Sequence, residues 1–244
     1  MALYVYGIVE ARSRAPSERG IADAPLRLIE GDGSAALVSE IDGDRVRLGR
    51  DAVLRHARVL EQALELGPVL PMRFGVVMSG PEEVQTRLLE EHAEELRAQL
   101  TDFSGKVEIR IRAVYDEESL MHEVVRGNPE IASLREAVRA GSEDATYYDR
   151  IRLGEMVATG VERRRERDAE AIVDALAAGA LAVEVGGPTH ERVVVQASFL
   201  VERDRLAKFD QIVDDIAAGY GGGIRFKYTG PLPPHSFVEL AETV

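Results

Sequence analysis

Hydrophobic positions in the first part of the chain follow two patterns, one typical of strands and one of helices. Apolar residues cluster at 3–9, where many are β-branched or aromatic, and again at 35–41, which predicts two buried strands. From Asp51 the apolar residues recur at helical spacing, and Gly67, followed by proline, predicts the end of that helix. Residues 11–34 are rich in proline and glycine, so we expect them to be mostly loop.

Residues 69–78 form an extended apolar segment that contains Pro71. Because proline cannot donate a hydrogen bond to a neighbouring strand, we expect an edge strand or an interrupted one. A second amphipathic helix is predicted to open at Pro81. Its apolar stripe runs from Val84 to Leu100, and glutamates occupy its solvent-facing side.

The second part of the chain shows the order strand, helices, strand, strand, helix, strand. The predicted elements are a strand at 106–115, three helices between 117 and 179, strands at 180–185 and 192–201, a helix at 206–219 and a strand at 223–230. This is the split βαβ order of a ferredoxin-like sandwich with extra helices in its first crossover. The sequence therefore predicts an α+β protein with an N-terminal α+β domain at 1–103. A modified ferredoxin-like domain follows at 104–244, with an inserted set of long helices at about 116–180.

The composition is that of a folded protein without cysteine chemistry. The 244 residues are 45% hydrophobic and 30% charged, which excludes a disordered chain. Cysteine is absent, so disulfides, thiolate metal sites and cysteine nucleophiles are excluded. The formal net charge of −13 disfavours nucleic acid as a partner. Neither a signal peptide nor a long uncharged apolar run is evident, so we expect a soluble cytoplasmic protein without a membrane partner.

The sequence contains no recognisable motif for catalysis or metal binding. Its five histidines include no helix-spaced pair, and neither a nucleophile elbow nor a phosphate-binding loop occurs. Residues 31–36 match the spacing of a dinucleotide-binding fingerprint, but they precede a predicted strand rather than a helix, so we interpret them as a turn. We therefore expect no catalytic residue, no cofactor, no metal and no small-molecule substrate.

One basic cluster stands out within the predicted helices. Residues 162–168 contain three acids and four arginines, which are Arg163, Arg164, Arg165 and Arg167. The four arginines are candidate interaction residues, because such a cluster could dock an acidic partner helix. The alternative is an exposed helical segment held by ion pairs between near neighbours, such as Glu162 with Arg165. We favour this second interpretation, and the first stays open.

Four segments carry a resemblance to a known family. They are residues 3–9 (LYVYGIV), 69–75 (VLPMRFG), 105–111 (GKVEIRI) and 229–238 (TGPLPPHSFV). In order and spacing they resemble the gas vesicle GvpL/GvpF family over essentially the whole chain. The two proline-containing segments, LPMRFG and GPLPP, are the most specific of the four.

The resemblance implies an accessory protein of gas vesicle assembly, not an enzyme, located in the cytoplasm and at the gas vesicle. Its expected partners are the small hydrophobic shell protein and other accessory proteins, and the family brings no catalytic or metal-binding residues. The Pro71 segment and the helical insertion are the candidate contact surfaces. The alternative is an enzyme or small-ligand-binding protein with an unrecognised site between the two domains.

Overall fold

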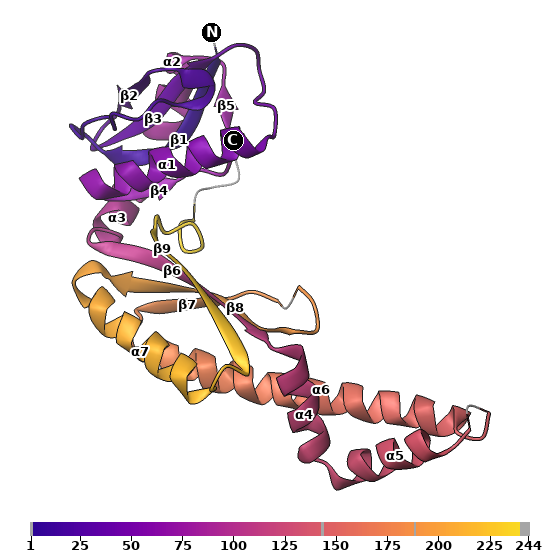
Figure 1. The fold of residues 1–244 in the computed structure, drawn as a ribbon. Coiled ribbons are helices and arrows are strands. Elements are labelled where there is room, and N and C mark those ends of the chain that lie inside the picture. Colours follow the sequence, from indigo (N-terminus) through magenta and orange to yellow (C-terminus); the bar gives the residue numbers. More distant parts are fainter. Residues whose placement is uncertain (1, 143, 188, 240–244) are drawn as a thin grey trace. The chain divides into compact units, whose positions relative to one another are not determined.

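The computed structural model describes residues 2–142, 144–187 and 189–239 and divides into two compact units by its internal contacts (Figure 1). The first unit holds residues up to Ile109, together with Leu200–Asp204 and the residues from Gly230 onward. The second unit holds Arg110–Phe199 and Arg205–Thr229. The domain boundary at residues 103 and 104 stays a prediction, because one strand contributes to both units. Residues 240–244 of the predicted second domain lie outside the described residues.

The first unit is built on a five-stranded sheet. Its strands are β1 (Ala2–Glu10), β2 (Leu26–Glu30), β3 (Ser34–Ile41), β4 (Val69–Pro71) and β5 (Val77–Met78). They follow the order β2-β3-β1-β4, and β5 also pairs with β1. The central strand β1 is antiparallel to β3, with a register shift between Val5 and Gly7. A Cβ atom at Gly7 would lie 2.8 Å from the Leu70 carbonyl oxygen, so the glycine permits β4 to pack closely against β1.

Helices lie on both faces of this sheet, which gives the first unit three layers. They are α1 (Arg50–Leu66), α2 (Pro81–Glu83), a π-helical turn (Val84–Glu90) and α3 (Ala93–Asp102). Side chains of a strand alternate between its two faces. Accordingly, Leu3 and Val5 of β1 join the apolar cluster formed with the Val84–Glu90 turn and α3, whereas Tyr4 and Tyr6 face His56 of α1.

The expectation that residues 11–34 are mostly loop misses the strand β2. Its alternation is weak within the sequence, and β2 forms because Arg27 and Leu28 pair with Val38 and Leu37 of β3. The Pro71 segment is extended and interrupted, as predicted, with β4 at the sheet edge and β5 following the break. Val69, Leu70 and Pro71 are all buried, so this segment offers little apolar surface to a partner.

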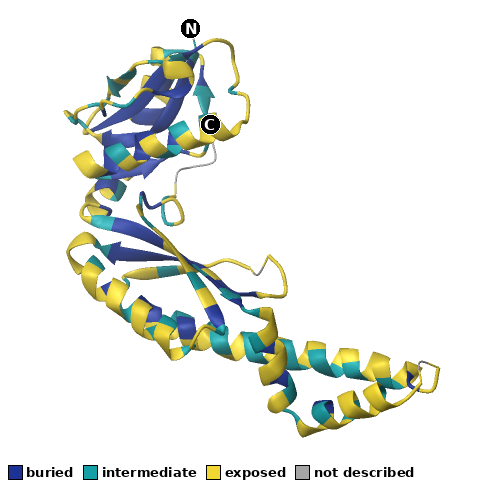
Figure 2. Cartoon of the chain, in the orientation of Figure 1, coloured by how far each residue is buried: buried dark blue, intermediate teal, exposed yellow. Residues whose placement is uncertain are grey.

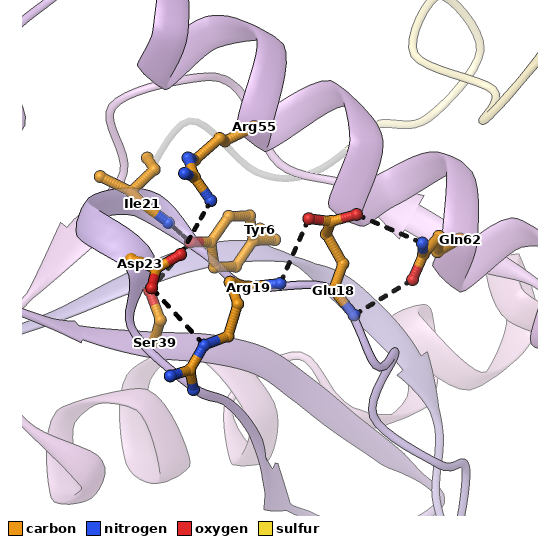
Figure 3. Close-up of polar contacts among 8 residues, drawn as sticks. All are labelled: Tyr6, Glu18, Arg19, Ile21, Asp23, Ser39, Arg55 and Gln62. Carbon is orange, nitrogen blue, oxygen red and sulfur yellow. Dashed lines mark hydrogen bonds and ion pairs between the residues drawn. The ribbon is translucent and has the colours of Figure 1, made fainter.

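A loop of residues 11–25, which we call the strap, crosses β1 and α1 and is held by polar contacts from both (Figure 3). The Tyr6 hydroxyl accepts a hydrogen bond from the Ile21 amide at 2.7 Å and lies 2.9 Å from the Ser39 hydroxyl. Arg55 of α1 pairs with Asp23 at 3.3 Å. Ala22 and Asp23 have φ angles of 55° and 61°, which L-residues rarely adopt. The polar contacts from β1 and α1 therefore hold the backbone of the strap in a strained conformation.

The second sheet has four strands in the order β7-β8-β6-β9. They are β6 (Lys106–Tyr115), β7 (Ala182–Val185), β8 (Val193–Glu202) and β9 (Ile224–Leu232). The helices are α4 (Glu117–Arg126), α5 (Pro129–Ala140), α6 (Tyr147–Ala177) and α7 (Leu206–Gly219). The order places β8 between β6 and β7, as a split βαβ unit requires. This part of the chain therefore has the predicted strand order, with three helices in the first crossover.

The helices α6 and α7 pack on one face of this sheet. Phe199 of β8 meets Phe209 of α7 with ring centroids 5.5 Å apart, and Tyr115 of β6 donates a hydrogen bond to Asp168 of α6. Within the described residues, no helix combines the length and the apolar character that crossing a membrane requires.

Candidate functional site

The helical insertion α4–α5–α6 is the part of the second unit that exceeds a simple split βαβ core. Its helices begin where the sequence supplies caps. The Asp116 carboxylate accepts a hydrogen bond from the Ser119 amide at the start of α4, and the Asn128 side chain accepts from Glu130 and Ile131 at the start of α5. Pro129 occupies the first turn of α5, where its missing N–H costs nothing. Both α4 and α5 pack against α6.

Gly160 allows the helices to approach closely. A Cβ atom at this position would lie 2.9 Å from Cγ1 of Val124 on α4 and 3.7 Å from Cδ1 of Ile131 on α5. Val124 and Ile131 are buried, so the contact at Gly160 forms the small core of the insertion. On either side of this contact the surface is hollowed into a groove.

The first hollow, which we call the apolar groove, has a volume of about 910 Å³. Its floor comes from α4 and α6, and its rim from both helices and residues 190–192. The floor residues are Leu120, Met121, Gly154, Val157, Ala158 and Val161, and the rim residues are Glu117, Glu162, His190, Glu191 and Arg192. Met121 is 40% exposed, which is unusual for a large apolar side chain. The groove is suited to receive apolar side chains from another molecule.

Both signs of charge occur on the rim, and they are partly paired with each other. Arg192 donates from Nη1 to the Glu117 carboxylate at 3.1 Å, and Glu162 is held by Arg165. The side-chain hydrogen bond from Arg165 lowers the pKa of Glu162 below its ordinary value. A mixed, paired rim around an apolar floor favours contact with an amphipathic segment rather than with a highly charged one.

The candidate arginines separate into two pairs with different surroundings. Arg164 forms an ion pair with Glu123 of α4, and its Nε lies 3.2 Å from the Asp168 carboxylate. Asp168 also accepts a 2.6 Å hydrogen bond from the Tyr115 hydroxyl. Burial, and then this hydrogen bond, raises the pKa of Tyr115. Arg164 therefore ties α4 to α6, and Arg165, through Glu162, forms the near-neighbour ion pair that the sequence suggested.

Arg163 and Arg167 line a second hollow, the basic groove, of about 660 Å³ between α4 and α6, to which Arg164 also contributes. Both side chains are exposed, and among the residues that the structure describes neither is in an ion pair. The Arg167 Nε donates to the Arg163 carbonyl oxygen at 3.2 Å. Of the four arginines, these two are placed to meet a partner, and their role in docking stays a prediction.

Within the described residues 2–142, 144–187 and 189–239, no group of three or more potential metal ligands gathers. The apolar groove was missed by inspection of the sequence. Its signal was present, because Gly154, Val157, Ala158 and Val161 follow helical spacing on one side of α6. The helical spacing alone, however, does not show whether another element of the protein covers this face of α6 or leaves it exposed.

The family model described as "Gas vesicle synthesis protein GvpL/GvpF" matches residues 2–239. Gas vesicle protein F of Streptomyces sp. (strain CB03234) is 40% identical over 245 residues, covering 98% of this chain and 100% of that protein. Gas vesicle protein L2 of Halobacterium salinarum is 30% identical over 258 residues, covering 96% of this chain and 90% of that protein.

Two crystal structures share the fold. GvpF from Anabaena sp. PCC7120 superposes with a TM-score of 0.85 at 23% identity, and GvpF from Microcystis aeruginosa with a TM-score of 0.78 at 25% identity. Each match covers 98% of this chain and 99% of the other. The matched family model and the relatives agree with the resemblance that the four sequence segments carry. The chain belongs to the GvpL/GvpF family of gas vesicle synthesis proteins.

Proposed function

We propose that the protein is a non-enzymatic assembly factor that binds the small hydrophobic shell protein of the gas vesicle and works with other accessory proteins. The observation that carries this proposal is the apolar groove on the insertion. It is an open, apolar surface on a chain whose other helices present mostly charged side chains to water. A shell protein must expose an apolar face toward gas, and before assembly that face is prone to aggregate in water.

The dimensions of the groove support reversible binding. A hollow of about 910 Å³ accommodates several side chains of an amphipathic segment. Burying one Leu, Ile or Val side chain contributes about 1.5–3 kcal/mol. Association itself costs roughly 4–15 kcal/mol in lost freedom of motion. A few buried side chains therefore give a complex that forms and dissociates readily, as an assembly factor requires.

The net charge supports the same role. At −13, the chain repels other copies of itself and stays dispersed while it carries an apolar client. We place this activity in the cytoplasm and at the growing gas vesicle.

Co-expression with the shell protein tests the proposal. The wild-type chain should increase the soluble fraction of the shell protein, and Ala158→Arg should abolish this increase, because the new side chain lies across the groove floor. Ala158 is exposed and arginine is a good helix former, so the helix should persist. The matched control is Ala137→Arg, at an exposed position of α5 that lines no described groove.

The control variant should protect the shell protein as well as the wild type does. Melting temperatures of both variants establish that they fold. Equal precipitation of the shell protein with and without the wild-type chain would refute the chaperone role. Full protection by a folded Ala158→Arg variant would refute the groove as the contact surface.

A further inference from the structure

The second sheet presents a basic face on the side opposite its helices. Side chains alternate along a strand, and three contacts show which side the helices occupy. Tyr115 of β6 reaches Asp168 of α6, Tyr228 of β9 bonds with Asp210 of α7, and the Phe226 ring lies 6.1 Å from that of Tyr220. The side chains at the intervening positions therefore lie on the other face. Those of β6 and β9 include five bases. Lys106 pairs with Asp102, and we call the other four, Arg110, Arg112, Arg225 and Lys227, the basic sheet face.

The register of β6 and β9 brings these bases together. The Asp116 amide donates to the Gly223 carbonyl at 2.9 Å, and a Cβ atom at Gly230 would lie 2.7 Å from Cδ1 of Ile109. Counting inward from both ends of this antiparallel pair places Arg112 directly beside Lys227. Like charges at directly opposed positions destabilise a sheet. The repulsion is relieved if an anionic group lies between them.

The chain itself supplies few carboxylates to this face. Glu108 of β6 lies on it, where the carboxylate is buried and accepts hydrogen bonds from the amide and the hydroxyl of Ser236. Within the described residues no carboxylate lies at ion-pair distance from Arg112, Arg225 or Lys227. Arg112 contacts the His190 ring at 3.1 Å, and the charge of Arg225 adds to the Ser119 hydrogen bonds that lower the pKa of Asp116. Glu184 is on β7, which β8 separates from β6. Arg110 has an interaction of its own, so the argument rests on the other three bases.

Arg225 and Lys227 are exposed, and Arg112 is half-buried. The strand β9 as a whole carries mostly exposed and intermediate positions (Figure 2). A positive face of this kind on a chain of net charge −13 is a local inversion of sign. Arginine binds carboxylates through two parallel hydrogen bonds, which gives such a face both affinity and geometric preference.

We propose that the basic sheet face binds an acidic segment of a partner protein. The partner is a protein rather than a nucleic acid, because sheets that bind single strands stack bases on exposed aromatic rings. Here the aromatic side chains of β9, Phe226 and Tyr228, lie on the helix side. This site differs from the apolar groove, and its failure would leave the proposed function intact.

Fluorescence anisotropy with a labelled poly-glutamate peptide tests this proposal on the full chain. The wild type should bind the peptide with an affinity that falls as salt is raised. The double variant Arg112→Gln/Lys227→Gln should bind about tenfold more weakly, a loss of about 1.4 kcal/mol. Its melting temperature should stay the same or rise, because the substitution removes a repulsion.

The matched control is Arg135→Gln/Arg139→Gln, which removes the same charge from exposed positions of α5 in the same unit. It should bind the peptide within about twofold of the wild type. An equal loss in the control would show general electrostatic attraction and overturn the proposal. So would tighter binding of a labelled oligothymidylate through Arg112 and Lys227, which would assign the face to nucleic acid. Salt-sensitive self-association lost in the Arg112→Gln/Lys227→Gln variant would assign it to a second copy of this chain.

Discussion

Gly160 of α6 lies so close to Val124 of α4 that a Cβ atom on the glycine would be 2.9 Å from Cγ1 of the valine. Gly154, less than two turns earlier in the same helix, has nothing within 4 Å of its own Cβ position. The two glycines look alike in the sequence. Only at Gly160 does the packing of two helices depend on the missing side chain.

This contrast predicts opposite effects of alanine at the two positions. Gly154→Ala should raise the free energy of unfolding by about 1 kcal/mol, because glycine is a poor helix former. Gly160→Ala gains the same propensity but overpacks the contact with Val124, at a cost of about 1–3 kcal/mol. Its net effect should be a loss of roughly 1 kcal/mol. Urea unfolding of both variants measures the difference, and equal stabilisation would mean that α4 is not packed on Gly160.

His56 predicts how stability depends on acid. Its ring lies among Tyr4, Tyr6 and Phe74, and Nδ1 is 2.9 Å from the Tyr4 hydroxyl. Burial, and to a lesser degree the charge of His235, lowers the pKa of His56 to about 4 from an ordinary value near 6.5. Between these two values the unfolded chain binds a proton at His56 and the folded chain does not. The stability that the neutral His56 contributes is therefore fully present above pH 6.5. The free energy of unfolding falls by about 3 kcal/mol as the pH drops toward 4.

Unfolding of the wild type and of His56→Gln across this pH range isolates the contribution of the histidine. Carboxylates with lowered pKa values far from His56, such as Glu83 and Asp116, contribute equally to both proteins. The variant should be less stable near neutral pH, since it disturbs the buried cluster, but its stability should decline less on acidification. Parallel curves for the two proteins would show that His56 is protonated as easily in the folded chain as in the unfolded one.

The strap depends on the hydroxyl group of Tyr6. Tyr6→Phe leaves the Ile21 amide and the buried Ser39 hydroxyl without this partner, which should cost about 1–3 kcal/mol of unfolding free energy. The Ile21 amide should also exchange faster with solvent. As a comparison, Glu18→Ala removes a weak 3.4 Å contact with Gln62 and should change stability by less than about 0.5 kcal/mol. Unchanged exchange at Ile21 in Tyr6→Phe would show that other contacts hold the strap.

The arginines of the basic cluster should differ in their effect on stability. Arg164→Ala removes the contacts with the exposed Glu123 and the half-buried Asp168 and leaves Asp168 without this cation, which should cost about 1–2 kcal/mol. Arg163→Ala removes an exposed side chain and should change stability by less than about 0.5 kcal/mol. Thermal and urea unfolding of the two variants measure these changes. Equal effects would mean that the link between α4 and α6 does not depend on Arg164.

Local patterns in the sequence were sufficient for most elements. The alternation in residues 106–115 predicted β6 at its full length, and Gly67 marked the end of α1. These signals succeed because side-chain periodicity and the conformational preferences of glycine and proline act within one element. Local signals did not predict the strand β2, because it is stabilised by pairing with β3 rather than by the pattern of its own residues.

The candidate binding surfaces could be identified only from the tertiary structure. Residues 162–168 form one basic cluster in the sequence, yet Arg164 pairs with Glu123, 41 positions earlier. Among the described residues, only Arg163 and Arg167 of the four arginines form no ion pair. The apolar groove and the basic sheet face likewise depend on which faces the neighbouring elements cover. By itself the sequence determined most of the elements, the strand order of the second sheet and the family resemblance. The tertiary structure decided which charges are neutralised and which apolar side chains stay open, because ion pairing and burial depend on distances between residues far apart in the chain.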